Sequence, residues 1–388
     1  MPSSTLIERV SSVMAVPAKP RQGGLNLVGD FAETRVRSYA AALAGSGTPL
    51  SRLDWAGGVP VPVGDDEPFA YATTLLALDG DQLVDYVGEV GIDSLRDRRT
   101  IIAWEWPLAD APSGAAAQAA MVGEVWVPSS FVNTALHRVA PRPVLVVPPA
   151  VVVPSNVSRA EAGIPDGFVF VAVGRLGRCR PGEVALVNPL GAIEAFKMAF
   201  APGCGPLLSV VLQGRKTAAT AEACRLAAQE RPDVTVSETD DPALADAASV
   251  TGDCLVSLHR ASAFGPDLAR ALAVGCPVVS TAYGGPMDFL SEQCAGLVPY
   301  TIVKSAAATY PFPAGTSWAE PDLDAAVSCL RSVYEDLSEA RRKAWLGRPG
   351  VIRRSGPKAA ARALRRQLGE PPFVVPQARD RHRIGAAR

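Results

Sequence analysis

The chain has 388 residues, 48% of them hydrophobic and 20% charged, and a formal net charge of −1. This length exceeds one ordinary core and predicts two domains, and the composition excludes a disordered chain. The near-neutral charge excludes a general affinity for nucleic acid, and no apolar run is long enough to span a membrane. Seven scattered cysteines without a C-x-x-C pair predict reduced thiols in a cytoplasmic protein, with neither a disulfide framework nor a zinc site.

The first half of the chain is predicted to form one α/β domain. Residues 1–22 lack the apolar core of a signal peptide and are interpreted as a loose leader. Residues 23–155 alternate short apolar runs with helical patterns, which predicts a Rossmann-like domain. The expected elements are a strand at 23–30 closed by Gly29, a helix at 35–44, a strand at 49–55, a strand leading to a polar turn at 73–83, a strand at 98–107, a strand–turn–helix unit at 123–136 and a proline-punctuated connection at 143–154.

The second half predicts another domain of the same class over residues 156–345, followed by a basic helix and tail over 346–388. Alternating strands and helices of this length imply parallel, doubly wound sheets. Ligands are then expected beyond the carboxyl ends of the strands, in the cleft between the domains. The expected elements are a strand at 168–178, a helix at 189–200, a strand at 207–214, a helix at 218–229, a strand at 234–238 and a longer unit at 255–289.

The 255–289 unit, LVSLHRASAFGPDLARALAVGCPVVSTAYGGPMDF, carries the most information. It predicts a buried strand, a turn with His259 and Arg260, a helix over 266–274, a second strand over 277–281 and a Gly-Gly loop. A polar loop between a strand and a helix N-terminus is typical of an anion-binding corner, because free backbone N–H groups and the helix dipole converge there.

This segment resembles the nucleotide-sugar segment of family 4 (group 1) glycosyltransferases, roughly S-L-H-R-S-E-G-F-G-L-x-x-A-E-A-M-A-x-G-x-P-V-I-A-T. Further segments resemble a polysaccharide-cluster branch of that family in the expected order over residues 24–335: NLVGDFAETRVRSYAAAL, LLALDGDQL, IIAWEWP, EVWVPSSFV, NPLGAIEAFKMAF and SWAEPD. The resemblance implies the GT-B fold, in which two Rossmann-like domains face each other across a cleft. It further implies an acceptor on the N-terminal domain, a nucleotide sugar on the C-terminal domain, and transfer that retains anomeric configuration without a metal or other cofactor.

The resemblance assigns donor-site roles that this chain fills only in part. His259, Arg260 and Ser262 fall on catalytic positions, and donor-binding positions fall on Phe264, Gly265, Arg270, Gly284 and Gly285. The two glutamates of the E-x7-E pattern are replaced by Ser262 and Arg270. Pro266 and Asp267 begin the helix; the first has no N–H to offer a phosphate, and the second brings a negative charge.

Cations for a diphosphate are expected at the strand ends of the second domain. The lysine of the family's Arg-Lys-Asn-Pro segment is replaced by Val187. Substitutes are available after the first and second strands of this domain. They are Arg175, Arg178 and Arg180 after the first strand, and Arg215 and Lys216 after the second. Each is either a donor-site cation or a solvated loop residue.

Acceptor-binding residues are expected in the N-terminal domain. Trp104-Glu105-Trp106 places a carboxylate between two indoles beside a strand end, which suits sugar stacking or, alternatively, a core aromatic clamp. Asp81 lies near another strand end, and Gly29 closes the first strand. We therefore assign Gly29, Asp81, Trp104 and Glu105 to the acceptor site.

Two functions remain open at this point. One is a retaining glycosyltransferase with a divergent donor site, acting on a glycan or lipid-linked acceptor at the cytoplasmic face of the membrane. The other is a catalytically inactive member that binds a glycan or a partner subunit. Residues 341–388 hold fourteen Lys and Arg against two acidic residues, which indicates either a solvated helix and tail or peripheral contact with anionic membrane. An NAD-dependent dehydrogenase is disfavoured, because no G-x-G-x-x-G follows a strand.

Overall fold

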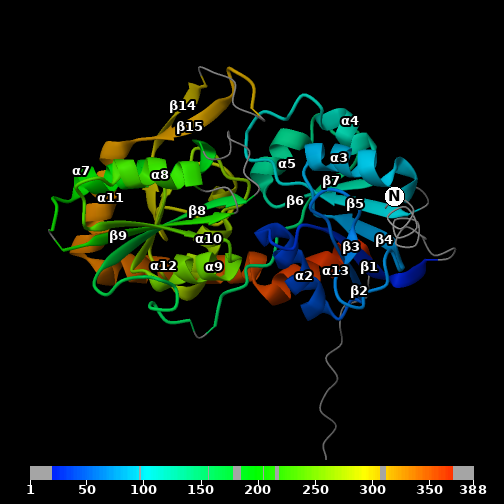
Figure 1. Cartoon of the computed structure of the whole chain (residues 1–388), viewed down its shortest axis with the longest axis horizontal. Helices are drawn as coiled ribbons and strands as arrows, with labels where there is room; N and C mark the ends of the chain where they lie inside the picture. Colours follow the sequence, from blue (N-terminus) through cyan, green and yellow to red (C-terminus); the bar gives the residue numbers. More distant parts are fainter. Residues whose placement is uncertain are drawn as a thin grey trace, which may run out of the picture.

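The computed structural model describes residues 20–95, 98–155, 157–177, 185–203, 205–214, 218–305 and 312–369. Two α/β domains lie side by side, each built on its own sheet (Figure 1). The predicted pair of parallel, doubly wound sheets is confirmed. No helix among the described residues is long and apolar enough to cross a bilayer.

The N-terminal sheet has the strand order β3-β2-β1-β4-β5-β6-β7. All neighbouring strands are parallel except β3, which pairs antiparallel with β2. Its strands are β1 (Arg21–Gly29), β2 (Leu50–Asp54), β3 (Val61–Pro62), β4 (Tyr71–Leu76), β5 (Arg99–Ala103), β6 (Glu124–Val127) and β7 (Val144–Val146). The helices that follow them are α2 (Thr34–Ser46), α3 (Gly80–Val90), the short η1 (Ile92–Leu95), α4 (Ala115–Ala120) and α5 (Ser130–Leu136).

The C-terminal sheet has the order β10-β9-β8-β11-β12-β13 and is parallel throughout. Its strands are β8 (Val169–Gly177), β9 (Leu207–Gly214), β10 (Val234–Thr239), β11 (Cys254–Ser257), β12 (Val278–Thr281) and β13 (Gly296–Val298). Its helices are α7 (Pro189–Ala199), α8 (Ala218–Ala227), α9 (Pro242–Thr251), α10 (Pro266–Val274), the short η2 (Gly285–Asp288) and α11 (Leu323–Glu335). An antiparallel hairpin of β14 (Tyr300–Lys304) and β15 (Ser317–Pro321), absent from the sequence prediction, is added beside this domain.

Alternating side chains explain why both faces of each sheet are covered. In β1, Leu27 packs into one hydrophobic core with Tyr39 of α2, whereas its neighbour Val28 packs into another on the opposite face. In β4, Leu75 likewise packs into the core that contains Leu27, and Leu76 packs into the core that contains Val28. Successive strand residues point to opposite faces, so strands that are apolar at every position require helices on both sides.

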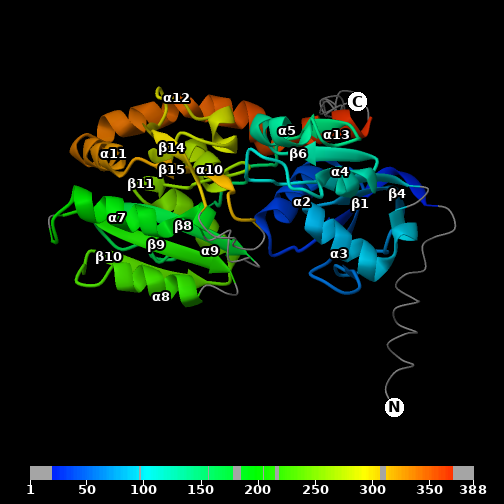
Figure 2. The same ribbon diagram turned by 90° about the horizontal axis from the view of Figure 1, so that it is seen from above.

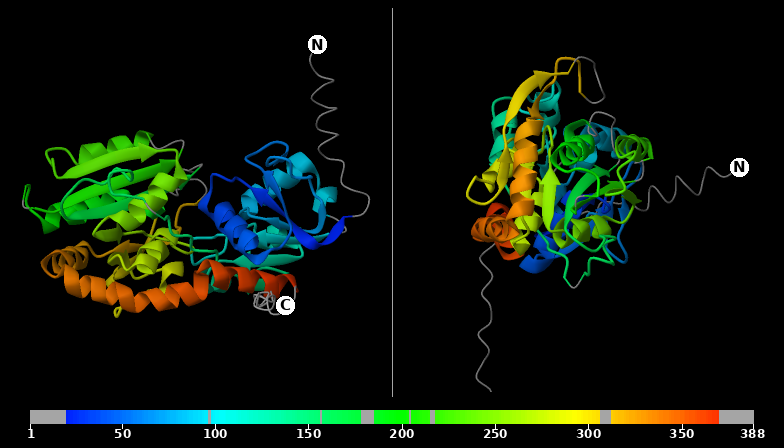
Figure 3. Two further views of the ribbon diagram at one scale, coloured as in Figure 1. Left: turned by 90° about the horizontal axis from the view of Figure 1, so that it is seen from below. Right: turned by 90° about the vertical axis from the view of Figure 1, so that its left-hand side faces the viewer.

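The last two helices connect the domains. α12 (Leu337–Ser355) packs along the C-terminal domain, and α13 (Pro357–Leu368) crosses over to pack against α2 of the N-terminal domain (Figures 2 and 3). Ala360 and Leu364 of α13 are buried in the same core as Tyr39. The expected domain end at residue 345 therefore falls inside α12. The expected leader also ends too late, because β1 begins at Arg21; residues 1–19 and 370–388 lie outside the described residues.

The packing of α13 predicts that Leu364→Ala destabilises the protein. Leu364 is 1% exposed, and its truncation should lower the free energy of unfolding by about 2–4 kcal/mol through lost burial and an unfilled cavity. Urea denaturation followed by circular dichroism measures the loss. The matched control is Leu226→Ala on α8, where the side chain is 68% exposed and the change should stay within about 0.5 kcal/mol. Equal losses in the two variants would contradict the docking of α13.

Candidate functional site

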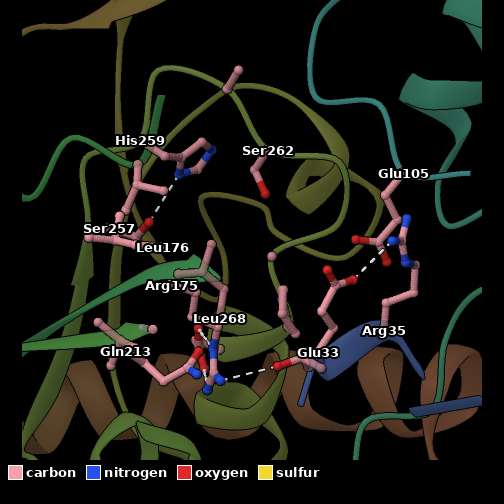
Figure 4. Close-up of a pocket in the computed structure, with 18 of the residues that line it drawn as sticks. Glu33, Arg35, Glu105, Arg175, Leu176, Gln213, Ser257, His259, Ser262 and Leu268 are labelled. Carbon is pink, nitrogen blue, oxygen red and sulfur yellow. Dashed lines mark hydrogen bonds and ion pairs between the residues drawn. The ribbon is translucent and has the colours of Figure 1, made fainter. Parts of the chain in front are cut away.

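A cavity of about 520 Å³ lies between the two domains (Figure 4). Its walls are the loops that follow β1, β4 and β5 on one side and the carboxyl ends of β8, β9 and β11 with the start of α10 on the other. This is the edge where parallel α/β sheets expose their loops. The cavity therefore lies where the sequence places the ligand cleft.

The N-terminal wall is rich in carboxylates around one buried arginine. Arg35 donates from Nη2 to Glu33 Oε2 at 2.9 Å and to Gln82 Oε1 at 3.1 Å. Glu105 faces the same space and has no hydrogen bond to any residue that the structure describes. Burial raises the pKa of Glu105; nearby Arg35 opposes that shift and Glu33 adds to it. The wall thus presents carboxylate oxygens available to a ligand's hydroxyl groups.

The first turn of α10 forms one part of the C-terminal wall. Gly265 is the N-cap residue with φ of 78°, a backbone conformation that favours glycine, and Pro266 follows at the start of the helix. Gly265, Asp267 and Leu268 all line the cavity. First-turn N–H groups have no partner within the helix, so this end of α10 is suited to an anion.

A buried ionic network lies behind that helix start. Arg175 of β8 holds Asp267 with two hydrogen bonds of 2.7 Å, and Arg270 Nη1 donates to Asp267 Oδ1 at 2.9 Å. Both arginines also bind Asp246 of α9, at 2.6 Å and 3.1 Å. Burial alone would raise the pKa of Asp267, but Arg175 and then Arg270 outweigh it, so that pKa lies below its ordinary value. The negative charge predicted to repel a phosphate is therefore compensated.

The same network reaches the other domain. Arg37 of α2 pairs with Asp246 at 3.2 Å, and Arg175 Nη1 donates to Thr34 Oγ1 at 3.1 Å. Three arginines consequently share two aspartates, one arginine coming from the N-terminal domain and two from the C-terminal domain. These contacts also fix how the two walls face each other.

Of the predicted catalytic residues, His259 and Ser262 line the cavity and Arg260 does not. Both ring nitrogens of His259 are occupied: Nδ1 lies 3.1 Å from Ser257 Oγ, and Nε2 lies 3.0 Å from the carbonyl oxygen of Tyr283. A carbonyl only accepts, so Nε2 carries the proton. Burial lowers the pKa of His259, which keeps the ring neutral. The Ser262 hydroxyl has no hydrogen bond to any described residue.

Arg260 is a correction to the sequence prediction. Its guanidinium makes a two-bond ion pair with Glu320 of β15, at 2.6 and 2.7 Å, and donates to the carbonyl oxygen of Ala185. It therefore fastens the β14–β15 hairpin to the strand end instead of facing the cavity.

Four predicted donor-site residues also lie away from the cavity. Phe264 is 3% exposed and packs in the C-terminal core against Phe289. Arg270 lies beneath α10, held by its aspartates. Gly284 and Gly285 allow the loop to lie against residues 262–264, because a Cβ on either would overlap backbone atoms there. Their lack of side chains serves packing between two protein segments.

Three of the predicted acceptor-binding residues also lie away from the cavity, where they contribute to packing or hydrogen bonding within the protein. Trp104 is 1% exposed in the N-terminal core, which makes the aromatic-clamp alternative the correct one. Asp81 accepts a hydrogen bond from Gln118 Nε2 at 2.9 Å and is absent from the cavity wall. Gly29 lets α2 and the end of β4 approach closely, since a Cβ there would meet Val36. Of the four residues predicted to bind the acceptor, Glu105 lines the cavity.

The remaining predictions concern cations and a neighbouring apolar position. Arg175 lines the cavity, as does Val187, so the position of the family's lysine contributes an apolar surface. Arg178, Arg180, Arg215 and Lys216 lie outside the described residues. No group of three or more His, Cys, Asp or Glu side chains among the described residues is arranged to hold a metal ion.

Sequence reasoning missed Gln213, Glu33 and Arg35. Gln213 is the penultimate residue of β9, is 7% exposed and lines the cavity, and its side-chain amide makes no hydrogen bond to a described residue. A polar residue at the end of an otherwise apolar parallel strand is the signal that would have identified it. Glu33 and Arg35 follow the first strand in the segment GDFAETR, and their charges at a strand end carry the same signal.

Comparison with family models and with curated proteins finds no match. Solved structures do match. Sucrose-phosphate synthase from Thermosynechococcus elongatus has a TM-score of 0.63 at 17% identity over 90% of this chain and 99% of its own. HepE from Anabaena, solved with UDP and glucose, has a TM-score of 0.62 at 15% identity over 89% and 99%. A glycosyltransferase from Rickettsia africae has a TM-score of 0.60 at 11% identity over 90% and 98%. The predicted GT-B fold is thereby confirmed.

The ionic network predicts that Arg270→Glu is strongly destabilising. The substitution removes one partner of Asp267 and adds a carboxylate beside two others, so the free energy of unfolding should fall by about 3–5 kcal/mol in urea denaturation. Arg225→Glu is the control, because its pair with Glu238 is exposed and should contribute about 1 kcal/mol or less. Similar losses in both variants would rule out a structural role for the network.

His259 predicts a pH dependence of stability. Its pKa is lowered in the folded protein, so between that value and about 6.5 the unfolded chain binds a proton that the folded chain does not. The free energy of unfolding should therefore decrease as the pH falls below about 6.5. His259→Gln, which keeps a donor for the Tyr283 carbonyl, should lose less stability than the wild type between about pH 7.5 and about pH 5.5. Identical losses in urea denaturation would refute this account.

Proposed function

We propose that this protein is a retaining glycosyltransferase. It moves a sugar from a nucleotide-diphosphate sugar to a glycan or lipid-linked acceptor in polysaccharide or glycoconjugate biosynthesis. The observation that carries the proposal is the cavity between two GT-B domains, with a helix N-terminus and Arg175 on one wall and carboxylates around Arg35 on the other. HepE, which shares the fold, was solved with UDP and with UDP-glucose.

The start of α10 supports a diphosphate site on the C-terminal wall. The N–H groups of its first turn and the helix dipole favour an anion, and Pro266 removes only a donor that the helix itself would not use. An aspartate about 4 Å from a phosphate would cost roughly 4 kcal/mol at an effective dielectric near 20. Arg175 and Arg270 offset this cost. Arg178, Arg215 and Lys216 stay predicted as further cations.

The nucleoside is proposed to bind beside Gln213. This amide lies at the carboxyl end of β9 without a hydrogen bond to a described residue, and it offers both a donor and an acceptor. A buried amide of this kind is costly unless a ligand or water satisfies it. A nucleobase or a ribose hydroxyl meets that requirement.

The acceptor is proposed to bind on the N-terminal wall. Glu105 and Glu33 can accept hydrogen bonds from sugar hydroxyls, and Arg35 lies between them. Carboxylates that accept hydrogen bonds from vicinal hydroxyls give stronger contacts than neutral acceptors do. This arrangement suits a polyhydroxylated acceptor in the half of the cavity opposite α10.

The proposed reaction needs no protein base and no metal. The bond between the anomeric carbon and the diphosphate oxygen breaks, and the acceptor oxygen bonds to that carbon on the same face. The acceptor proton passes to the departing phosphate. His259 does not take it, because both of its ring nitrogens are occupied. Arg175 and the N-terminus of α10 stabilise the charge that develops on the leaving group. We place the reaction in the cytoplasm, at the inner face of the membrane.

Calorimetric titration with UDP- and GDP-sugars, with free UDP and GDP as controls, tests the proposal. One nucleotide is expected to bind with micromolar affinity. No binding at millimolar ligand by a folded protein would reject the transferase and favour the inactive, glycan-binding alternative.

Glu105→Gln separates the two halves of the cavity. It should leave nucleotide affinity unchanged and lower kcat/KM for the acceptor about tenfold or more, because a charge-assisted hydrogen bond is lost. Glu335→Gln, at the exposed end of α11, is the matched control and should leave both quantities unchanged. Unaltered transfer by Glu105→Gln would remove Glu105 from the acceptor site without affecting the donor site.

A further inference from the structure

The helices α12 and α13 follow each other along one edge of the molecule, the first on the C-terminal domain and the second on the N-terminal domain (Figure 3). Between Arg341 and Gly369 the chain has ten Lys and Arg residues and no acidic residue. Four of these cations, Arg353, Lys358, Arg362 and Arg366, are exposed along the two helices and together span both domains.

α12 combines this charge with exposed apolar side chains. Its inner side, with Ala344, Gly347 and Val351, is buried against the C-terminal domain. Its outer side exposes three large apolar residues: Trp345 at 53%, Leu346 at 57% and Ile352 at 40%. Residues 345 and 352 lie two helical turns apart on the same side, with 346 beside them. Trp345 lies against Gly275 and beneath the Arg348 guanidinium, whereas Leu346 and Ile352 belong to none of the hydrophobic cores that the described residues form.

α13 is also amphipathic, with one side buried and the opposite side exposed. Its inner side is held in the N-terminal core, while Lys358, Arg362 and Arg366 recur every four residues on its exposed side. These three cations, like Arg353 at the end of α12, have no hydrogen bond or ion pair with any residue in the described part of the chain. Arg354, by contrast, pairs inward with Asp288. The outward cations are not needed to hold either helix.

We propose that this basic outer face is a docking surface for an anionic lipid membrane. It is defined by Trp345, Leu346, Ile352, Arg353, Lys358, Arg362 and Arg366. Trp, Leu and Ile side chains enter the boundary between headgroups and acyl chains, and the surrounding cations meet anionic headgroups. A nucleic acid would use the charges but has no use for the exposed aliphatic groups, which favours lipid. This inference names the surface that would hold the protein at the membrane face given under the proposed function. It rests on that proposed function only for the presence of the acceptor at the membrane.

Sedimentation of the full-length protein with vesicles tests the surface without any sugar donor. The protein should bind phosphatidylcholine vesicles that contain phosphatidylglycerol, bind pure phosphatidylcholine weakly, and dissociate at high salt. Trp345→Ala combined with Leu346→Ala should weaken binding about tenfold or more. Because Trp345 also covers Gly275, the single variant Leu346→Asp is a second test that leaves this contact in place. Leu226→Ala on α8, which is at least as exposed, should bind like the wild type.

Charge is tested by a matched pair of variants. Arg362→Ser with Arg366→Ser should weaken binding about tenfold or more, at roughly fivefold per charge near an anionic surface. Lys197→Ser with Arg225→Ser changes the net charge equally on α7 and α8, away from α12 (Figure 2), and should have little effect. All variants should keep the wild-type affinity for UDP or GDP, so loss of vesicle binding is distinguishable from failure of the transferase proposal.

Three results would overturn the proposal. The first is equal binding to neutral and anionic vesicles, and the second is an equal loss in both charge variants. The third is binding to RNA or an acidic polysaccharide that depends on the cations but not on Trp345 and Leu346, which would assign the surface to a soluble polyanion.

Discussion

The cleft depends on the buried contacts among Arg175, Asp267 and Arg270. Each of these charges would be costly to bury alone, and together with Asp246 they satisfy one another. The network joins β8, α9 and α10 behind the C-terminal wall of the cavity, and through Arg37 it reaches α2 of the N-terminal domain. The same set of ion pairs therefore contributes to both the domain arrangement and the charge around the cavity.

This dependence explains why two departures from the glycosyltransferase pattern occur together. Asp267 and Arg270 are three residues apart on one helix, so their side chains lie on the same side and pair directly. An aspartate at a helix start would by itself oppose an anion, and an arginine in place of a glutamate would by itself remove an acceptor. Paired, they keep the helix N-terminus electrostatically compatible with a phosphate.

Local patterns predicted the fold and the edge at which the cavity lies, because alternating strands and helices fix the order of a parallel sheet and bring strand ends together. They could not predict which side chain at a strand end turns inward. Trp104 and Glu105 are adjacent, yet one is core and the other lines the cavity. Arg260 finds Glu320 sixty positions along the chain, on a hairpin that no periodicity indicated. Such pairings are decided by tertiary packing, where propensity and spacing carry no information.

The groups in the cavity are arranged for charge stabilisation more than for proton transfer. His259 is neutral, buried and bonded through both nitrogens, so it positions the Tyr283 loop and cannot exchange a proton without breaking a contact. The arginines, in contrast, are held rigidly by aspartates beside a helix N-terminus, and fixed dipoles and charges need no reorganisation when a leaving group gains charge. A transfer in which the diphosphate accepts the proton needs no protein base, and it is therefore compatible with this cavity. Under the proposed function its specificity would reside on the opposite wall, which Glu33, Arg35 and Glu105 line.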